Sequence, residues 1–177
     1  MMPRNAPHTG RMKPAIGFLH AHGTDSQSVT DTPTILTWSH IHFICSGLQI
    51  ADTETRIRVR KGGAGIYMIH AQAGIARASG TPAVAIIYVY KNNALCDCSI
   101  SHGTMGAKEH ADMTIVYPIY LEEGDYIDIR ASVESGTGII EANTARITMQ
   151  EIPMYGYDNN KAGKKMFKGG IMRCKYG

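Results

Sequence analysis

The chain has 177 residues, of which 44% are hydrophobic and 19% are charged, values that are ordinary for one soluble globular domain with a full-sized core. No apolar run approaches the roughly 20 residues that span a bilayer, which excludes a membrane-spanning helix. The first 14 residues lack the apolar region of a secretory signal, so we expect the protein to stay where it is made or to leave by cell lysis.

The net charge of +3 is unevenly divided along the chain. Residues 1–14 carry three basic residues and no acid, and residues 154–177 carry six basic residues against one acid. The segment between them is therefore left with a net charge of −5. An acidic body with basic ends predicts that the ends meet acidic or phosphate groups on a partner.

Strand-like alternation recurs about every ten residues, and helical periodicity is almost absent. This pattern predicts an all-β antiparallel sandwich of about ten strands. Residues 1–13 are expected to form an extended N-terminal arm, and residues 23–33 a polar loop. The expected strands span residues 14–22, 35–45, 55–60, 65–72, 83–91, 95–101, 113–121, 126–133 and 145–152. A hairpin is expected across Asn92-Asn93, a pair that tolerates left-handed geometry.

Residues 113–133, MTIVYPIYLEEGDYIDIRASV, read as two strands joined by a tight acidic turn at Gly124. The second strand alternates between apolar and polar residues, which indicates one buried face and one solvated face. The first strand is apolar on both faces. One of these faces fits a core, and the other, with Val116, Pro118 and Tyr120, fits a second chain.

The strand expected at residues 83–91 is also apolar on both faces. Val84, Ile86 and Tyr88 lie on one face, and small or branched apolar residues lie on the other. A surface strand of a monomer is not expected to be apolar on both sides. We interpret both doubly apolar strands as parts of a subunit interface; the alternative is a central strand covered by a loop.

Three stretches, in this order, resemble the C1q/TNF-like jelly-roll family. Residues 65–70, GIYMIH, resemble its Gly-x-Tyr-x-Phe strand, with Ile69 at the aromatic position. Residues 84–93, VAIIYVYKNN, resemble the following strand and its Asn-Gly hairpin, with Asn93 in place of glycine. Residues 113–133 resemble the penultimate hairpin. The resemblance covers residues 14–153 and implies a C1q/TNF-like jelly roll that assembles as a homotrimer around a three-fold axis.

Two His-x-His pairs, His20/His22 and His40/His42, each place two imidazoles on one side of an expected strand. If the two strands pair, four imidazoles converge. Jelly-roll cupins use such a pair with a nearby glutamate for metal, but here no acidic residue follows the second pair until Asp52. We therefore predict no metal centre, with these four histidines as the candidates for one and exposed or interface histidines as the alternative.

No other motif indicates catalysis. The chain has no P-loop, no dinucleotide fingerprint and no Gly-x-Ser-x-Gly elbow. Arg56, Arg58 and Arg60 form a basic stripe that reads as a solvated strand face, with phosphate contact as the alternative. Cys96 and Cys98 are expected to be small buried residues on one strand face. We expect a protein without a cofactor and without enzymatic activity.

Residues 154–177 differ in character from the body of the chain. They are rich in glycine and lysine and interspersed with aromatic residues, which predicts an anchor that becomes ordered on a partner; a disordered tail is the alternative. The expected anchor residues are Tyr155, Tyr157, Lys164, Lys165, Phe167, Arg173 and Tyr176.

The resemblance and the missing secretion signal together suggest a function. Secreted C1q/TNF-like proteins carry signals and often collagen stalks, whereas phage and viral proteins reuse the module without them. The prediction is a virion protein, a homotrimeric capsid decoration (cement) or head-fibre protein that binds the major capsid protein or other virion subunits. Many copies bridging capsomers would stabilise the particle.

Three alternatives remain open at this point. A receptor-binding knob of a tail fibre would contact a host receptor through residues 23–33 and 102–110. A nucleic-acid-binding capsid protein would neutralise the genome with its basic ends. A metal-dependent jelly-roll enzyme would use the His-x-His pairs.

Overall fold

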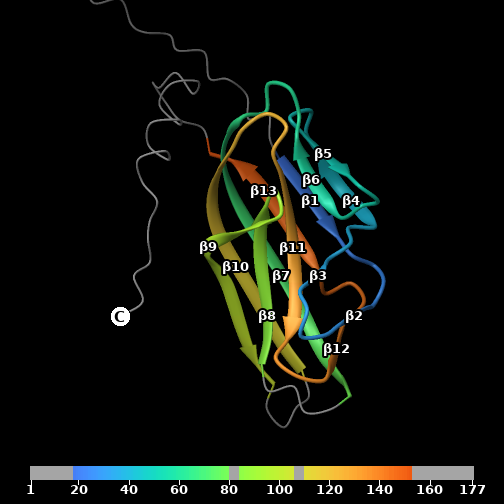
Figure 1. Ribbon diagram of the computed structural model, residues 1–177. Coiled ribbons are helices and arrows are strands. Elements are labelled where there is room, and N and C mark those ends of the chain that lie inside the picture. The colour runs from blue at the N-terminus through green and yellow to red at the C-terminus, as the bar shows by residue number, and fades with distance from the viewer. Residues whose placement is uncertain (1–17, 80–83, 106–109, 153–177) are drawn as a thin grey trace, which may run out of the picture.

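The computed structural model describes residues 18–79, 84–105 and 110–152 of the protein (Figure 1). These residues form strands, turns and loops, and none of them forms a helix that could cross a membrane. The strands are β1 (Phe18–His22), β2 (Gln27–Val29), β3 (Thr34–Ile35), β4 (His40–Ile44), β5 (Leu48–Ala51), β6 (Arg56–Val59), β7 (Gly65–Ser79), β8 (Val84–Lys91), β9 (Ala94–Thr104), β10 (His110–Leu121), β11 (Tyr126–Val133), β12 (Thr137–Ile140) and β13 (Arg146–Glu151).

The strands build two antiparallel sheets that stack as a sandwich (Figure 1). Sheet A runs β10-β7-β13-β1-β4, and β12 and β2 continue it beside the end of β7. Sheet B runs β5-β6-β11-β8-β9, with β3 paired to part of β11. The expected all-β antiparallel jelly roll is confirmed.

The core lies between the two sheets and follows from the period of two along the strands. In β8 the side chains of Ala85, Ile87 and Val89 are fully buried, while the alternate residues are half-buried. In β11 the side chains of Ile127 and Ile129 are buried in the same layer. Each of these strands therefore has one face in the core and one face on the outside of the sandwich.

The described residues contain 13 strands, more than the expected ten or so. The strand expected at residues 35–45 is broken, because Leu36 and Trp38 both turn into the core. The Leu36 N–H donates to Ile129 O and the Trp38 N–H donates to Glu54 O, so neither extends a regular ladder. Three further short strands, β2, β5 and β12, lie in segments where no strand was expected.

The prediction of a hairpin at residues 113–133 is wrong, because its two strands do not pair with each other. β10 pairs with β7 in sheet A, whereas β11 pairs with β8, β6 and β3 in sheet B. The acidic turn between them therefore carries the chain from one sheet to the other. Gly124 has a φ of 88° in this turn, as its position predicted.

The hairpin expected across Asn92-Asn93 is confirmed. β8 and β9 pair on either side of it, and both asparagines are left-handed.

Asp125 fixes the position of this crossing turn. Its carboxylate accepts hydrogen bonds of 2.7 Å from the Glu122 backbone N–H, the Asn92 side chain and the Lys91 ammonium. Burial of the carboxyl opposes ionisation, but the hydrogen bonds from Lys91, Asn92 and Glu122 outweigh it, and the pKa of Asp125 is lowered. One carboxylate thus ties the crossing turn to the β8–β9 hairpin.

Replacing Asp125 with alanine is expected to lower the free energy of unfolding by about 2 kcal/mol at pH 7, the scale of hydrogen bonds to a charged group. Because the pKa of Asp125 is lower in the folded state, its contribution is complete above about pH 4 and is lost as the pH falls through the folded value. Urea unfolding of both proteins at pH 7 and near pH 2, at one chain concentration, measures the difference. A difference that is equal at both pH values would contradict this assignment.

The expectation of two buried cysteines on β9 is wrong for Cys98, whereas Cys96 is partly buried and packs against the core. Cys98 is exposed and left-handed, with a φ of 59°, and the register with β8 shifts at this point. The shift turns Ser99 inward instead, where its hydroxyl lies 3.0 Å from Val89 O and 2.7 Å from Cys96 O. Cys96 is a half-buried free thiol, and burial raises its pKa to about 11.

Candidate functional site

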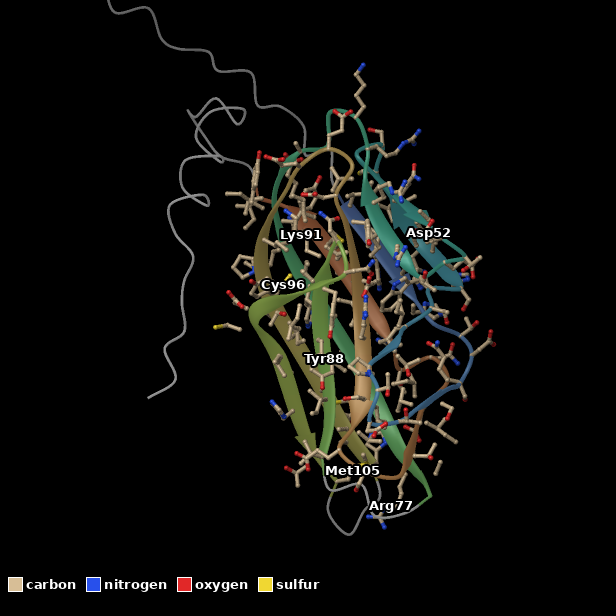
Figure 2. All side chains as sticks on the ribbon, in the orientation of Figure 1. Asp52, Arg77, Tyr88, Lys91, Cys96 and Met105 are labelled. Atoms are coloured by element: carbon tan, nitrogen blue, oxygen red, sulfur yellow. The ribbon has the colours of Figure 1, made fainter. Side chains whose placement is uncertain are left out.

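The first expected interface set, Val84, Ile86 and Tyr88, lies on the outer face of sheet B. All three side chains are half-buried within the single chain. The Tyr88 hydroxyl is 2.9 Å from the Ser132 hydroxyl, so its polar end has a hydrogen-bond partner within sheet B. Figure 2 shows the position of Tyr88 on β8. The strand is central in sheet B, and its outer face is apolar but only partly open.

The second expected set, Val116, Pro118 and Tyr120, lies on the outer face of sheet A. Val116 is 62% exposed, Pro118 is exposed and Tyr120 is half-buried. Burial, followed by the nearby carboxylates of Glu122 and Asp125, raises the pKa of Tyr120. The structure thus places the two expected sets on opposite outer faces of the sandwich and does not bring them together within one chain.

Strand pairing defines an open row of residues that crosses the outer face of sheet A from edge to edge. Val116 pairs with His70, His70 with Thr148, Thr148 with His20, and His20 with Phe43. The two ends of this row are apolar and exposed, Val116 at 62% and Phe43 at 54%. We call these five residues the sheet A row.

The edge strand β4 was not among the expected interface strands, yet all five of its residues are exposed. Ile41 is 43% exposed and Ile44 is 37% exposed, beside Phe43 in the sheet A row. The signal in the sequence was the run His40–Ile44, HIHFI, which has no charged residue to keep a sheet edge solvated.

The four histidines of the two His-x-His pairs do converge. β1 and β4 pair with His22 opposite His40, and a shift in the register after His20 brings His42 into the same group. Ring centroids are 4.9 Å apart for His20–His42 and His22–His40, 4.8 Å for His22–His42 and 4.7 Å for His40–His42. We call these four residues the histidine cluster.

Within the histidine cluster, His22 Nδ1 and His42 Nε2 are 2.8 Å apart, a hydrogen bond between two imidazoles. Desolvation first, and then repulsion by the neighbouring imidazoles and Arg146, lower the pKa of both His22 and His42. The lowered pKa favours the neutral form of both rings, in which each imidazole keeps a lone pair on one nitrogen. In the described ranges, no group of three or more His, Cys, Asp or Glu side chains is already arranged to hold a metal ion.

The outer face of sheet B carries a charged network that the sequence did not indicate. Asp128 is 1% exposed and accepts two hydrogen bonds from Arg130, at 2.6 and 3.3 Å. The Arg130 guanidinium lies 3.9 Å from the centre of the Tyr90 ring, and the Nε of Arg56 is 3.8 Å from the Asp128 carboxylate. The carboxylate is therefore outward-facing but covered by arginines.

The basic stripe of β6 is paired with acid. Arg56 Nη1 lies 3.0 Å from the Asp52 carboxylate, and Arg58 Nη2 lies 3.7 Å from it. Figure 2 shows Asp52 beside β5 and β6 of sheet B. Arg60 is exposed. These ion pairs fit the expected solvated strand face better than contact with phosphate.

The expected anchor residues Tyr155, Tyr157, Lys164, Lys165, Phe167, Arg173 and Tyr176 lie outside the described residues, as does the N-terminal arm at residues 1–13. Their assignment stays a prediction from the sequence.

No protein-family model and no curated protein matches the chain. Among solved structures, the fold is similar to Eiger TNF from S. frugiperda, with a TM-score of 0.61 and 12% identity over 81% of this chain and 97% of that chain. It is also similar to murine APRIL crystallised at pH 5.0, with a TM-score of 0.59 and 14% identity over 77% of this chain and 98% of that chain. At this identity the likeness shows the fold, a TNF-like jelly roll.

Proposed function

We propose that the protein is a non-enzymatic virion structural protein, a homotrimeric capsid decoration or head-fibre protein that binds neighbouring capsid subunits through its terminal segments. The observation that carries the self-association is the sheet A row, which crosses five strands and ends in exposed Val116 and Phe43, with exposed His70 and half-buried Thr148 and His20 between them. Covering the two apolar ends in an interface would stabilise an assembly relative to the monomer.

The placement of the two expected interface sets favours a ring over a two-fold dimer. Val116 and Val84 lie on opposite outer faces, because the residues next to them in β10 and β8 are buried in the same core. A two-fold contact uses one patch twice, whereas a closed ring joins two different patches on each subunit. Three copies are the number that the resemblance to the C1q/TNF-like family implies.

The role in a virion rests on the charge division along the chain. Residues 154–177 carry a net charge of +5, against −5 for the segment 15–153, so the tail and the acidic body favour different partners. Lysines and aromatic residues in one segment suit an acidic surface with apolar pockets. Three such tails on one trimer would bind together far more tightly than one, because the second and third attach at high effective concentration.

Truncation after Pro153 tests this role. The shortened protein is expected to keep its fold and oligomeric state but to lose binding to undecorated capsids by at least about a hundredfold, the scale of lost multivalency. Co-sedimentation with the particles measures the binding, and deletion of residues 1–13 serves as the comparison for the other basic end. Equal binding of the full chain and the truncated chain would contradict the anchor and favour the receptor-binding alternative.

A further inference from the structure

The histidine cluster gathers four imidazoles at one end of the sheet A row, all on the outer side of β1 and β4. Its nearest ring centroids are 4.7 to 4.9 Å apart. The groups that act electrostatically on His22 are the other three histidines and Arg146, the residue opposite His22 on β13, and no carboxylate is among them. Four bases without an acidic partner are not explained by ion pairing.

We propose that the histidine cluster binds one divalent ion of the late first-row transition metals, with His22 and His42 as the first two ligands. Neutral imidazole is a ligand that suits zinc, nickel and copper. His22 Nδ1 and His42 Nε2 are 2.8 Å apart, so the ion would take the place of the proton shared between them, and that proton would move to the other nitrogen of the same ring, which leaves both imidazoles neutral. Each strand contributes one ligand, so the ion also joins β1 to the edge strand β4.

The geometry requires a small opening of the two rings. Two imidazole nitrogens bound to one tetrahedral zinc ion, at about 2.0–2.1 Å each, are about 3.3 Å apart. The observed 2.8 Å separation must therefore widen by about half an ångström. His42 is exposed and His22 is half-buried, so both can adjust. The rings must move for a site to form, because in the described part of the chain no group of three or more His, Cys, Asp or Glu side chains could hold a metal ion as now arranged.

The other two histidines supply the third ligand. His42 has His20 at 4.9 Å and His40 at 4.7 Å between ring centroids, which makes these two residues the candidates for the third ligand, and water would complete the shell. The positive charge of Arg146 weakens the binding of any cation at the cluster, and the cluster offers no oxygen ligand. Magnesium and calcium, which require oxygen ligands, are therefore excluded from this site.

Calorimetric titration of the full chain, purified without a histidine tag, with NiCl₂, ZnCl₂ and MgCl₂ tests the proposal. The expected result is one nickel or zinc ion per chain and no binding of magnesium. The His22→Ala/His42→Ala variant is expected to bind nickel at least about tenfold more weakly, whereas a His102→Ala variant, which removes an exposed histidine of β9 outside both the cluster and the sheet A row, binds as the wild type does.

The result that would overturn the proposal is either a wild-type protein that binds neither nickel nor zinc, or a cluster variant that binds nickel as tightly as the wild type. His22→Gln/His42→Gln, which keeps polar side chains at both positions, replaces the alanine variant if that one does not fold. The titration involves no capsid, so its failure and the failure of the proposed virion role can be told apart; because His20 also belongs to the sheet A row, the mass of the wild-type chain is measured in the same buffer.

Discussion

Replacing Asp128 with alanine is expected to lower the free energy of unfolding by about 3 kcal/mol or more. The Asp128 side chain is fully buried and is held by the bidentate contact from Arg130 at 2.6 and 3.3 Å. Removing one partner of a buried ion pair leaves the other charge without compensation, which costs about 3–5 kcal/mol. Arg130 is 17% exposed, so partial hydration places the expected loss at the lower end of that range.

Asp52→Ala is the matched control. Asp52 also pairs with an arginine, Arg56, at 3.0 Å, but its side chain is 44% exposed, and exposed pairs contribute about 0–1 kcal/mol. Urea unfolding at pH 7 and one chain concentration compares the two variants with the wild type. If Asp128→Ala costs no more than Asp52→Ala, the buried network on sheet B does not stabilise the fold as described.

Replacing Val116 with aspartate is expected to convert the proposed trimer into monomers while leaving the fold intact. The side chain is 62% exposed in the single chain, so the charge is hydrated in a monomer and costs little. In a closed ring each contact would bury an unpaired carboxylate, which costs about 2–5 kcal/mol or more per contact. With three such contacts per trimer, the variant would need a much higher protein concentration than the wild type to assemble.

Ser26→Asp provides the control for the added charge, because Ser26 is exposed in the loop after β1, away from both expected interface sets. Circular dichroism establishes that both variants keep the β structure, and size-exclusion chromatography with light scattering gives their masses. A Val116→Asp protein with the same mass as the wild type at every concentration would exclude β10 from the interface.

The alternation of side chains predicted much of the fold because a strand repeats every two residues. In β8 it assigned Ala85, Ile87 and Val89 to one face and Val84, Ile86 and Tyr88 to the other, as observed. It did not predict which sheet a strand joins. The turn at Gly124 specifies only that the chain reverses, and the choice of β7 or β11 as the partner of β10 depends on packing between distant segments.

The same limit applies to the candidate sites. Alternation placed Asp128 on an outer face, but its burial depends on Arg130 and Arg56 folding over it, which no local pattern encodes. The convergence of the histidines was predictable on the condition that β1 and β4 pair. The exposed left-handed Cys98, in contrast, arises from a register shift between β8 and β9, and the sequence carried no glycine or asparagine there to signal it.

Sedimentation equilibrium of the isolated wild-type chain at micromolar concentration tests the self-association most directly. A mass three times the 19.3 kDa of one chain is the predicted result, since the open face of sheet A and the apolar face of β8 are then covered by neighbouring copies. A stable species of 19.3 kDa across the micromolar range would contradict it.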